Sequence, residues 1–276
     1  GAAEYVDVEP FGTATVEDLD RFPWPDLAHP SRFEGLRAKA KVIRDAGYAV
    51  VALSGVTPFE QAYMCRGIEQ WMVDLAADPE FAVALMRKIT DLMLASVIRL
   101  LEEAGDYIDV LITGDDLGGQ TSTLISPAMY RRLIKPFHIE LMTGIKQRTQ
   151  AKIFYHSDGN VYSVLGDLVE IGVDLLNPVQ VSAGTMGDTA RLKREFGERL
   201  SFCGAIDTGW ALPFGTPDDV RAEVRRRIQD LAPGGGYILA AVHCIQPDVP
   251  VENVIAMLDE AKVAGRYPIK PSQQNL

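Results

Sequence analysis

Six short apolar segments alternate with amphipathic helical segments, and this alternation limits the possible folds more than any other feature of the chain. The apolar segments have strand length, are mostly apolar on both faces and end at glycine or polar residues, as is typical of parallel strands covered by helices. The predicted strands are Tyr48–Leu53, Ile108–Thr113, Lys152–Tyr155, Val173–Leu176, Leu200–Cys203 and Tyr237–Val242. The predicted helices are Phe33–Asp45, Glu60–Leu75, Pro79–Glu103, Pro127–Thr149, Val161–Ile171, Thr189–Phe196, Pro217–Leu231 and Val251–Ala261.

The order of elements predicts an α/β fold, either a barrel or a doubly wound sheet. A dinucleotide-binding sheet needs a glycine-rich turn after its first strand, and the turn Ser54-Gly55-Val56-Thr57-Pro58 is not one. A TIM barrel instead predicts reactive side chains after several strands, at one end of the barrel. We therefore expect a single barrel domain over residues 1–276, with an irregular N-terminal strap over 1–30 and a frayed tail over 268–276. Within the strap, Tyr5–Val8 is a candidate short strand.

Polar side chains follow five of the predicted strands. If these strands are parallel members of one barrel, the side chains converge on one mouth. The candidates there are Asp115, Asp116, His156, Asp158, Asn177, Gln180, Asp207, His243 and Cys244.

Each candidate also has a structural interpretation. Asp115 and Asp116 could cap the following turn, and His156 could be a buried histidine bonded to backbone. Asn177 and Asp207 could brace their loops. Among the remaining residues, packing is the favoured role for Cys65 and Cys203, and a structural or exposed position for His29 and His138. The convergence of the strand ends therefore carries more weight than any single residue.

Charge and cysteine content narrow the function class. The chain has 27 Lys and Arg against 38 Asp and Glu, a net charge of -11, which disfavours binding to nucleic acid or to an anionic membrane. Three cysteines are too few and too scattered for a disulfide framework and indicate a reducing compartment, so we expect a cytoplasmic protein. No apolar run reaches the roughly 18 residues of a membrane span.

Two chemistries fit the predicted mouth. His156, Asp158 and Cys244 carry nitrogen, oxygen and sulfur donors of the kind that Zn²⁺ accepts, and an open zinc position could hold a substrate thiol as thiolate. Alternatively, His243 with carboxylate help could transfer a proton to a carbanion-like carbon, as in a cofactor-free decarboxylation.

The closing segment His243-Cys244-Ile245-Gln246-Pro247-Asp248-Val249-Pro250-Val251-Glu252-Asn253 resembles the signature of the uroporphyrinogen decarboxylase superfamily. Thr57-Pro58-Phe59 leading to Tyr63-Met64, Ser126-Pro127 leading to Pro136, and Gly204-Ala205-Ile206-Asp207 are further matches. The resemblance extends over most of Ser31 to Ala261. It implies a TIM (β/α)8-type barrel, with the first one or two strand–helix units expected before Gly1.

The resemblance implies two possible branches. In the decarboxylase branch, the matching residues are Tyr63 and His243, while the arginine-rich motif of that enzyme is not visible. In the cobalamin-linked methyltransferase branch, a His-x-Cys pair and a later Cys hold the metal. Here the pair is His156-Ser157-Asp158 and the later residue is Cys244, so Asp158 replaces a cysteine.

The resemblance therefore favours a methyltransferase that moves a methyl group from methylcobalamin or a corrinoid protein to a thiol or folate. Its expected metal ligands are His156, Asp158 and Cys244, with Zn²⁺ as the cofactor. The expected catalytic residues are His243, Tyr63, Asp115, Asp116 and Asp207, and Asn177 and Gln180 are expected to contact the cofactor. The expected partners are a small-molecule substrate and a corrinoid protein, and a homodimer is allowed. A uroporphyrinogen decarboxylase and a non-catalytic binding barrel stay open as alternatives.

Overall fold

The computed structural model describes residues 9–56 and 58–269, which form two compact units. The first unit comprises the chain up to Asp116 together with Ser126–Ile153, and the second comprises Leu117–Ile125 and the chain from Phe154 onward. The described chain has six strands: β1 (Val51–Val56), β2 (Val110–Gly114), β3 (Lys152–His156), β4 (Leu175–Val179), β5 (Ser201–Ile206) and β6 (Tyr237–Ala241). Every strand pairing inside a unit is parallel, so the predicted α/β fold with six parallel strands is confirmed. Closure into a barrel stays a prediction.

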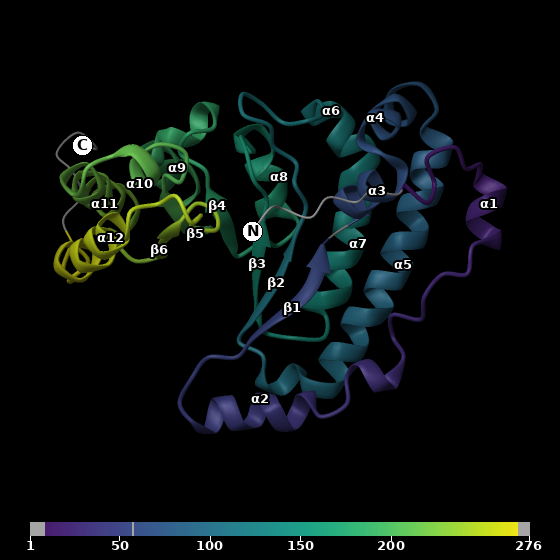
Figure 1. Cartoon of the computed structure of the whole chain (residues 1–276). Coiled ribbons are helices and arrows are strands. Elements are labelled where there is room, and N and C mark those ends of the chain that lie inside the picture. The colour runs from purple at the N-terminus through teal and green to yellow at the C-terminus, as the bar shows by residue number, and fades with distance from the viewer. Residues whose placement is uncertain (1–8, 57, 270–276) are drawn as a thin grey trace. The chain divides into compact units, whose positions relative to one another are not determined.

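In the first unit, β1 pairs with β2 in the register Val51↔Val110, and a layer of helices covers the pair. The long helix α5 (Pro79–Ala104) packs on β1 and on α7 (Lys135–Lys146), as Figure 1 shows. The helices α2 (Leu36–Asp45), α3 (Pro58–Arg66) and α4 (Ile68–Ala77) also pack on α5. These contacts bury one stripe of α5 at spacings of three and four residues, which is the pattern of an amphipathic helix.

The N-terminal strap of the first unit contains helix α1 (Val16–Arg21) and the 3-10 turn Pro30–Arg32. Phe11, Phe22 and Trp24 pack against one another with ring centroids 4.8–5.2 Å apart. The buried Arg66 holds the strap by donating to the carbonyls of Phe11 and Ala14. The candidate strand Tyr5–Val8 lies outside the described residues.

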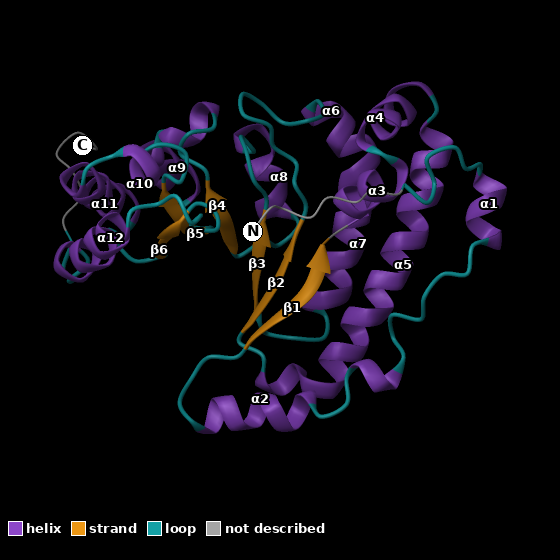
Figure 2. Ribbon diagram, in the orientation of Figure 1, coloured by secondary structure: helices purple, strands orange, loops and turns teal. Residues whose placement is uncertain are grey.

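In the second unit, β3, β4, β5 and β6 pair in chain order, and helices cover the sheet (Figure 2). The helices are α8 (Leu165–Glu170), α9 (Thr189–Phe196), α10 (Ala211–Phe214), α11 (Pro217–Leu231) and α12 (Val251–Ala264). The core between α11, α12 and the sheet contains Ile206, Val224 and Met257. Burial of these apolar side chains is the main source of stability in this unit.

Three predicted helices differ from the observed ones. The predicted helix Glu60–Leu75 is two helices, because Gly67 has a φ of +84° and ends the first of them. The predicted helix Pro127–Thr149 begins as α6 (Pro127–Met129), continues as a π-helical turn over Tyr130–Ile134 and becomes α7. The predicted helix Val161–Ile171 begins as a 3-10 turn at Tyr162–Val164.

Strands β1 and β6 are apolar as predicted, but they are not buried on both faces in the way expected of parallel strands covered by helices. Val51 and Leu53 of β1 are 55% and 72% exposed, and Ile238 of β6 is 52% exposed. In the tail, Tyr267 donates from its hydroxyl to the carbonyl of Ala232, whereas residues 270–276 lie outside the described part. None of the described helices is both long enough and apolar enough to cross a membrane.

Candidate active site

The loop that follows β3 presents the two donor side chains of the predicted His-x-Asp pair. His156 is the last residue of β3, and its Nε2 lies 3.8 Å from Oδ2 of Asp158. The side chains of His156 and Asp158 are 38% and 28% exposed, so both can be reached by solvent. We call residues 156–160 the His-Asp loop.

The His-Asp loop is held by the segment 117–125 of the same unit. The backbone N–H of Leu117 donates to the hydroxyl of Ser157 at 3.0 Å, and that of Asn160 donates to the carbonyl of Gly119 at 2.8 Å. Gly118 lies so close that a Cβ on it would be 2.5 Å from the carbonyl oxygen of Asp158. This close packing fixes the backbone that carries Asp158.

The two residues predicted to contact the cofactor contact the His-Asp loop and its histidine, and their predicted role toward a cofactor stays a prediction. Asn177 on β4 lies beside His156, and its Oδ1 is 2.8 Å from Nδ1 of that histidine. Gln180 accepts a hydrogen bond from the N–H of Gly159 at 2.7 Å through Oε1. Both residues therefore support the position of the donor side chains.

The loop after β6 brings His243 to the same carboxylate. Its Nε2 lies 3.9 Å from Oδ2 of Asp158, so His156 and His243 both lie within 4 Å of the same carboxylate oxygen. Cys244 is exposed, and its thiol makes no hydrogen bond with any residue in the described chain. Of the adjacent residues His243 and Cys244, His243 is the one whose side chain lies beside Asp158.

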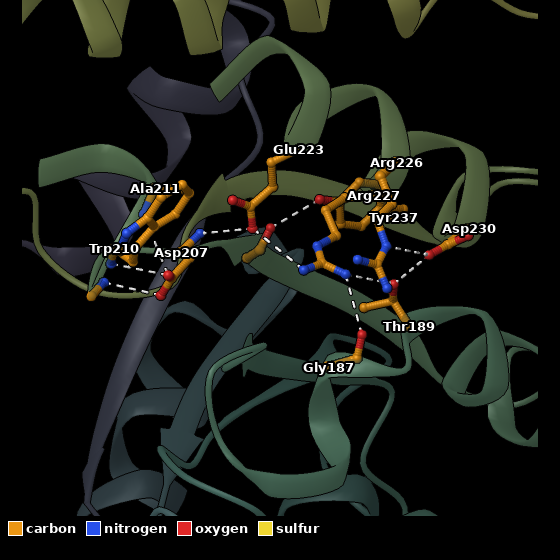
Figure 3. A network of polar contacts seen from close by, with 12 residues as sticks. Gly187, Thr189, Asp207, Trp210, Ala211, Glu223, Arg226, Arg227, Asp230 and Tyr237 are labelled. Atoms are coloured by element: carbon orange, nitrogen blue, oxygen red, sulfur yellow. Dashed lines mark hydrogen bonds and ion pairs between the residues drawn. The ribbon is translucent and has the colours of Figure 1, made fainter. Parts of the chain in front are cut away.

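Asp207 follows β5 and belongs to a polar network that Figure 3 shows from close by. Its carboxylate accepts from the N–H groups of Gly209 and Trp210, both at 3.0 Å, while its own N–H donates to Glu223. Glu223 accepts from Arg227, which also donates to Thr189. Within the described chain, every hydrogen bond of the Asp207 carboxylate goes to its own turn.

Burial shifts the pKa values of three side chains in this network. Desolvation raises the pKa of Glu223, and Arg227 opposes that shift as the neighbouring cation. Desolvation also lowers the pKa of Arg227 and raises that of Tyr237, whose hydroxyl donates to the carbonyl of Gly204. The network joins α11 to the end of β5.

In the first unit, Asp115 is completely buried at the N-terminus of α3. Its carboxylate accepts from the N–H groups of Phe59 at 3.1 Å and Glu60 at 2.6 Å, which are among the unpaired donors of a helix start. Nε2 of His138 lies 2.8 Å from Oδ2 of Asp115, and Nδ1 of the same ring lies 3.2 Å from the hydroxyl of Tyr130. Asp115 therefore joins α3 to α7.

The other candidates of the first unit lie on or near α3. Tyr63 is half-buried and packs edge to face against Phe59, with ring centroids 5.8 Å apart. The N–H of Asp116 donates to Glu60 at 3.4 Å. These contacts do not test the predicted catalytic roles of Tyr63 and Asp116, which stay predictions.

The predicted structural position of His138 agrees with its burial, but the sequence reasoning missed its contact with Asp115 and the ion pair of Glu223 with Arg227. His138 is in an apolar helix face, and nothing in the local pattern indicates that its partner is Asp115, on another element. Glu223 and Arg227 are four residues apart on α11, which is a readable ion-pair spacing, but their burial is not readable from that spacing.

Comparison with known proteins places the chain in a recognised group. Residues 4–263 match the family described as uroporphyrinogen decarboxylase (URO-D). A uroporphyrinogen decarboxylase from Pelodictyon phaeoclathratiforme is 23% identical over 190 residues, covering 67% of this chain and 50% of that protein. The enzyme from Coxiella burnetii is 22% identical over 256 residues, covering 89% of this chain and 66% of that protein. The chain thus spans between half and two thirds of the length of these relatives.

A solved structure shares the fold. A methyltransferase from Methanosarcina mazei superposes with a TM-score of 0.64 at 20% identity, covering 82% of this chain and 63% of that one. At this identity the likeness concerns the fold alone.

Proposed function

The chain belongs to the uroporphyrinogen decarboxylase family, and from that premise we propose that it is an enzyme that moves a methyl group from a methylcorrinoid to a thiol or folate acceptor. The observation that supports this choice most is the His156–Asp158 pair, because it offers a nitrogen and an oxygen donor 3.8 Å apart on a braced loop. The likeness in fold to a methyltransferase is compatible with it.

The donor set fits a zinc ion. Zinc takes histidine nitrogen, carboxylate oxygen and thiolate sulfur, and a catalytic site keeps one position for water or substrate. His156 and Asp158 would supply two ligands. The third would come from the loop after β6, from Cys244 or from His243, whose Nε2 lies 3.9 Å from Oδ2 of Asp158.

Zinc in such a site would supply a Lewis acid that lowers the pKa of an acceptor thiol. In the overall reaction a sulfur–carbon bond forms and the cobalt–carbon bond breaks. The electron pair of the broken bond stays on cobalt, and the thiol proton is released. With Cys244 as the third ligand, His243 would be left to accept that proton at Nε2, since its imidazole is 54% exposed and faces Asp158. The carboxylate of Asp158 would then stabilise the imidazolium.

Metal content and methyl transfer test this proposal together. We expect the purified chain to bind about one Zn²⁺, and Asp158→Cys to raise both zinc affinity and the rate of methylcobalamin demethylation with a small thiol. Thiolate ligands leave the metal less electrophilic and its bound thiolate more nucleophilic. Asp259→Cys is the matched control, because it adds a cysteine at an exposed aspartate on α12. If neither wild type nor Asp158→Cys binds zinc or consumes methylcobalamin, the methyltransferase proposal is wrong.

A decarboxylase is the second candidate. It is supported by the similarity to two uroporphyrinogen decarboxylases and by His243 beside Asp158, a pairing that suits proton transfer to carbon. Conversion of uroporphyrinogen without added metal, lost in His243→Gln, would put this candidate first. An absence of both activities with retained ligand binding would favour a non-catalytic binding barrel.

The partners follow from the proposed reaction. We propose a small-molecule acceptor and a protein-borne corrinoid as donor. Nucleic acid and anionic membranes are not proposed partners, because the chain carries a net charge of -11. We propose that the chain can form a homodimer, which sedimentation analysis tests.

A further inference from the structure

We propose that the first unit holds a binding site for a small organic anion with an apolar body, in a cavity that the N-terminal strap encloses together with α5. The cavity has a volume of about 520 Å³ and is lined by residues of the strap, β1, α3 and α5. Small-molecule sites in proteins typically measure roughly 300–1,000 Å³, so the cavity has the size of such a site. Of the described residues that line it, none belongs to the set proposed for methyl transfer, so the inference is independent of the proposed function.

Most of the cavity wall is apolar. The helix α5 contributes one stripe of its surface, at spacings of three and four residues, made up of Ile89, Leu92, Met93 and Ser96. The strap contributes the packed rings of Phe11, Phe22 and Trp24. A ligand with an apolar body would remove these surfaces from water, which is the main favourable contribution to binding in such a site.

The strap is fixed to the rest of the unit by hydrogen bonds. The backbone N–H of Phe11 donates to the carbonyl of Cys65 at 3.0 Å, and the buried Arg66 donates to the carbonyls of Phe11 and Ala14. The indole N–H of Trp24 donates to the carbonyl of Leu19 at 2.7 Å, so the orientation of this ring is fixed as well. The cavity is therefore formed before a ligand binds, which lowers the entropic cost of binding.

The charge of the cavity wall selects an anion. Among the described residues that line the cavity, Arg32 is the only charged one, although the whole chain has a net charge of -11. Its guanidinium is exposed and makes no ion pair or hydrogen bond within the described part of the chain. A guanidinium presents several N–H donors in a fixed plane and binds carboxylates and similar anions through two of them.

Two of the uncharged polar side chains in the wall already have partners in the protein. The hydroxyl of Ser54 donates to the carbonyl of Ile112 at 3.1 Å, and the amide of Gln61 donates to the thiol of Cys65 at 3.6 Å. Arg32 is therefore the group that would hold the charged end of a ligand, while the apolar wall holds its body. This combination of a mostly apolar wall with few polar groups is typical of small-molecule sites.

Two fluorescent probes with the same aromatic body test the preference for an anion. Anilinonaphthalene sulfonate carries a negative charge, and phenylnaphthylamine lacks it. We expect Arg32→Gln to weaken binding of the sulfonate about fivefold, as for an exposed ion pair, and to leave binding of the neutral probe within about twofold of wild type. Arg21→Gln is the matched control, because Arg21 is an exposed arginine on α1 of the same strap and does not line the cavity. Equal affinity of the sulfonate for wild type and Arg32→Gln would overturn the proposal.

A substitution that fills the cavity tests where the probes bind. Ser96 is a half-buried residue of the α5 stripe, and Ser96→Phe would place a ring in the space that a ligand needs. We expect this variant, with its fold checked by circular dichroism, to bind both probes about tenfold more weakly, because the apolar contact area for the probe is lost. Binding of both probes with wild-type affinity to folded Ser96→Phe would show that they bind elsewhere and would overturn the proposal.

The thiol of Cys65 reports on the cavity in the unaltered chain, because Cys65 is half-buried and lines it. Mass spectrometry can follow maleimide labelling of each cysteine separately. With the sulfonate probe at ten times its dissociation constant, labelling of Cys65 should be about tenfold slower, since only the unbound fraction reacts. Cys203 and Cys244 are internal controls, because neither lines the cavity, and their labelling should not change. An unchanged labelling rate of Cys65 at this probe concentration would overturn the proposal, whatever the outcome of the methyl-transfer assay.

Discussion

Replacing Asp115 by alanine should destabilise the protein strongly, because this carboxylate is a buried junction. It accepts from the backbone N–H groups of Phe59 and Glu60 and from the imidazole of His138, and none of its surface is exposed. Alanine at Asp115 would leave these donors buried without an acceptor.

The size of the effect follows from these three contacts. Hydrogen bonds to a charged group contribute about 1.5–3 kcal/mol each, and losses above about 4–5 kcal/mol are exceptional for one substitution. Partial hydration of the new cavity recovers some of the sum, so we expect Asp115→Ala to lower the free energy of unfolding by about 4 kcal/mol. Asp115→Asn keeps one acceptor oxygen and should cost about 2 kcal/mol.

Urea unfolding followed by circular dichroism measures these values. The combination of Asp115→Ala with His138→Gln should lose less than the sum of the two single variants, since the substitutions remove a shared contact. The exposed Asp259→Ala is the control and should stay within 0.5 kcal/mol of wild type, as is usual at the surface.

The outcome also decides between two roles for Asp115. The sequence predicts it as a catalytic residue, whereas its contacts in the structure are those of a helix cap. A stability loss below about 1 kcal/mol in Asp115→Ala, combined with loss of activity, would refute the junction described above.

Two further predictions concern titratable groups of the chain. Burial raises the pKa of Glu223 above its usual 4.5, so the folded state binds a proton at this carboxylate more tightly than the unfolded state does. The free energy of unfolding, compared with that of Glu223→Gln, should therefore be highest below pH 4.5 and should fall as the pH rises through the raised pKa. Urea unfolding at a series of pH values measures this dependence. Burial raises the thiol pKa of Cys65 and Cys203, whereas Cys244 is exposed. An aromatic disulfide reagent should therefore label one thiol per chain rapidly, that of Cys244. Rapid labelling that persists in Cys244→Ser would contradict this prediction.

Local sequence signals predicted the helices whose ends are determined locally. Pro79 begins α5 and Gly105 follows its last residue, while α9 and α11 match their predicted ranges to the residue. At these ends a capping side chain, a proline or a glycine begins or ends the helix through contacts within one helical turn. The break at Gly67 could not be read in the same way, because the turn it allows is held by distant contacts of Arg66 with the strap.

Strand limits depended on partners that are remote in the sequence. The strand β1 was predicted three residues too early, since its pairing with β2 begins at Val51. β5 was predicted to end at Cys203 but continues through Gly204 and Ala205, both with positive φ, because β6 pairs with it as far as Ile206.

In the candidate site too, the positions of residues along the chain could be predicted from the sequence, but contacts between distant elements could not. Chain position after a strand placed His156 and Asp158 on one loop. It could not show that His243 faces Asp158 or that Asn177 faces His156, because those contacts depend on register and on loop paths across several elements.

The close approach of Gly118 and Gly159 limits how this site can be altered during evolution or redesign. Any side chain at either position would push the two backbones apart, so the segment 117–125 and the His-Asp loop must change length and composition together. Surface loops usually tolerate insertions, but this pair should tolerate them only as coordinated double changes. Substrate specificity should therefore be easier to change through substitutions in the loop after β6, where His243 and Cys244 do not lie in such a close contact between two backbones.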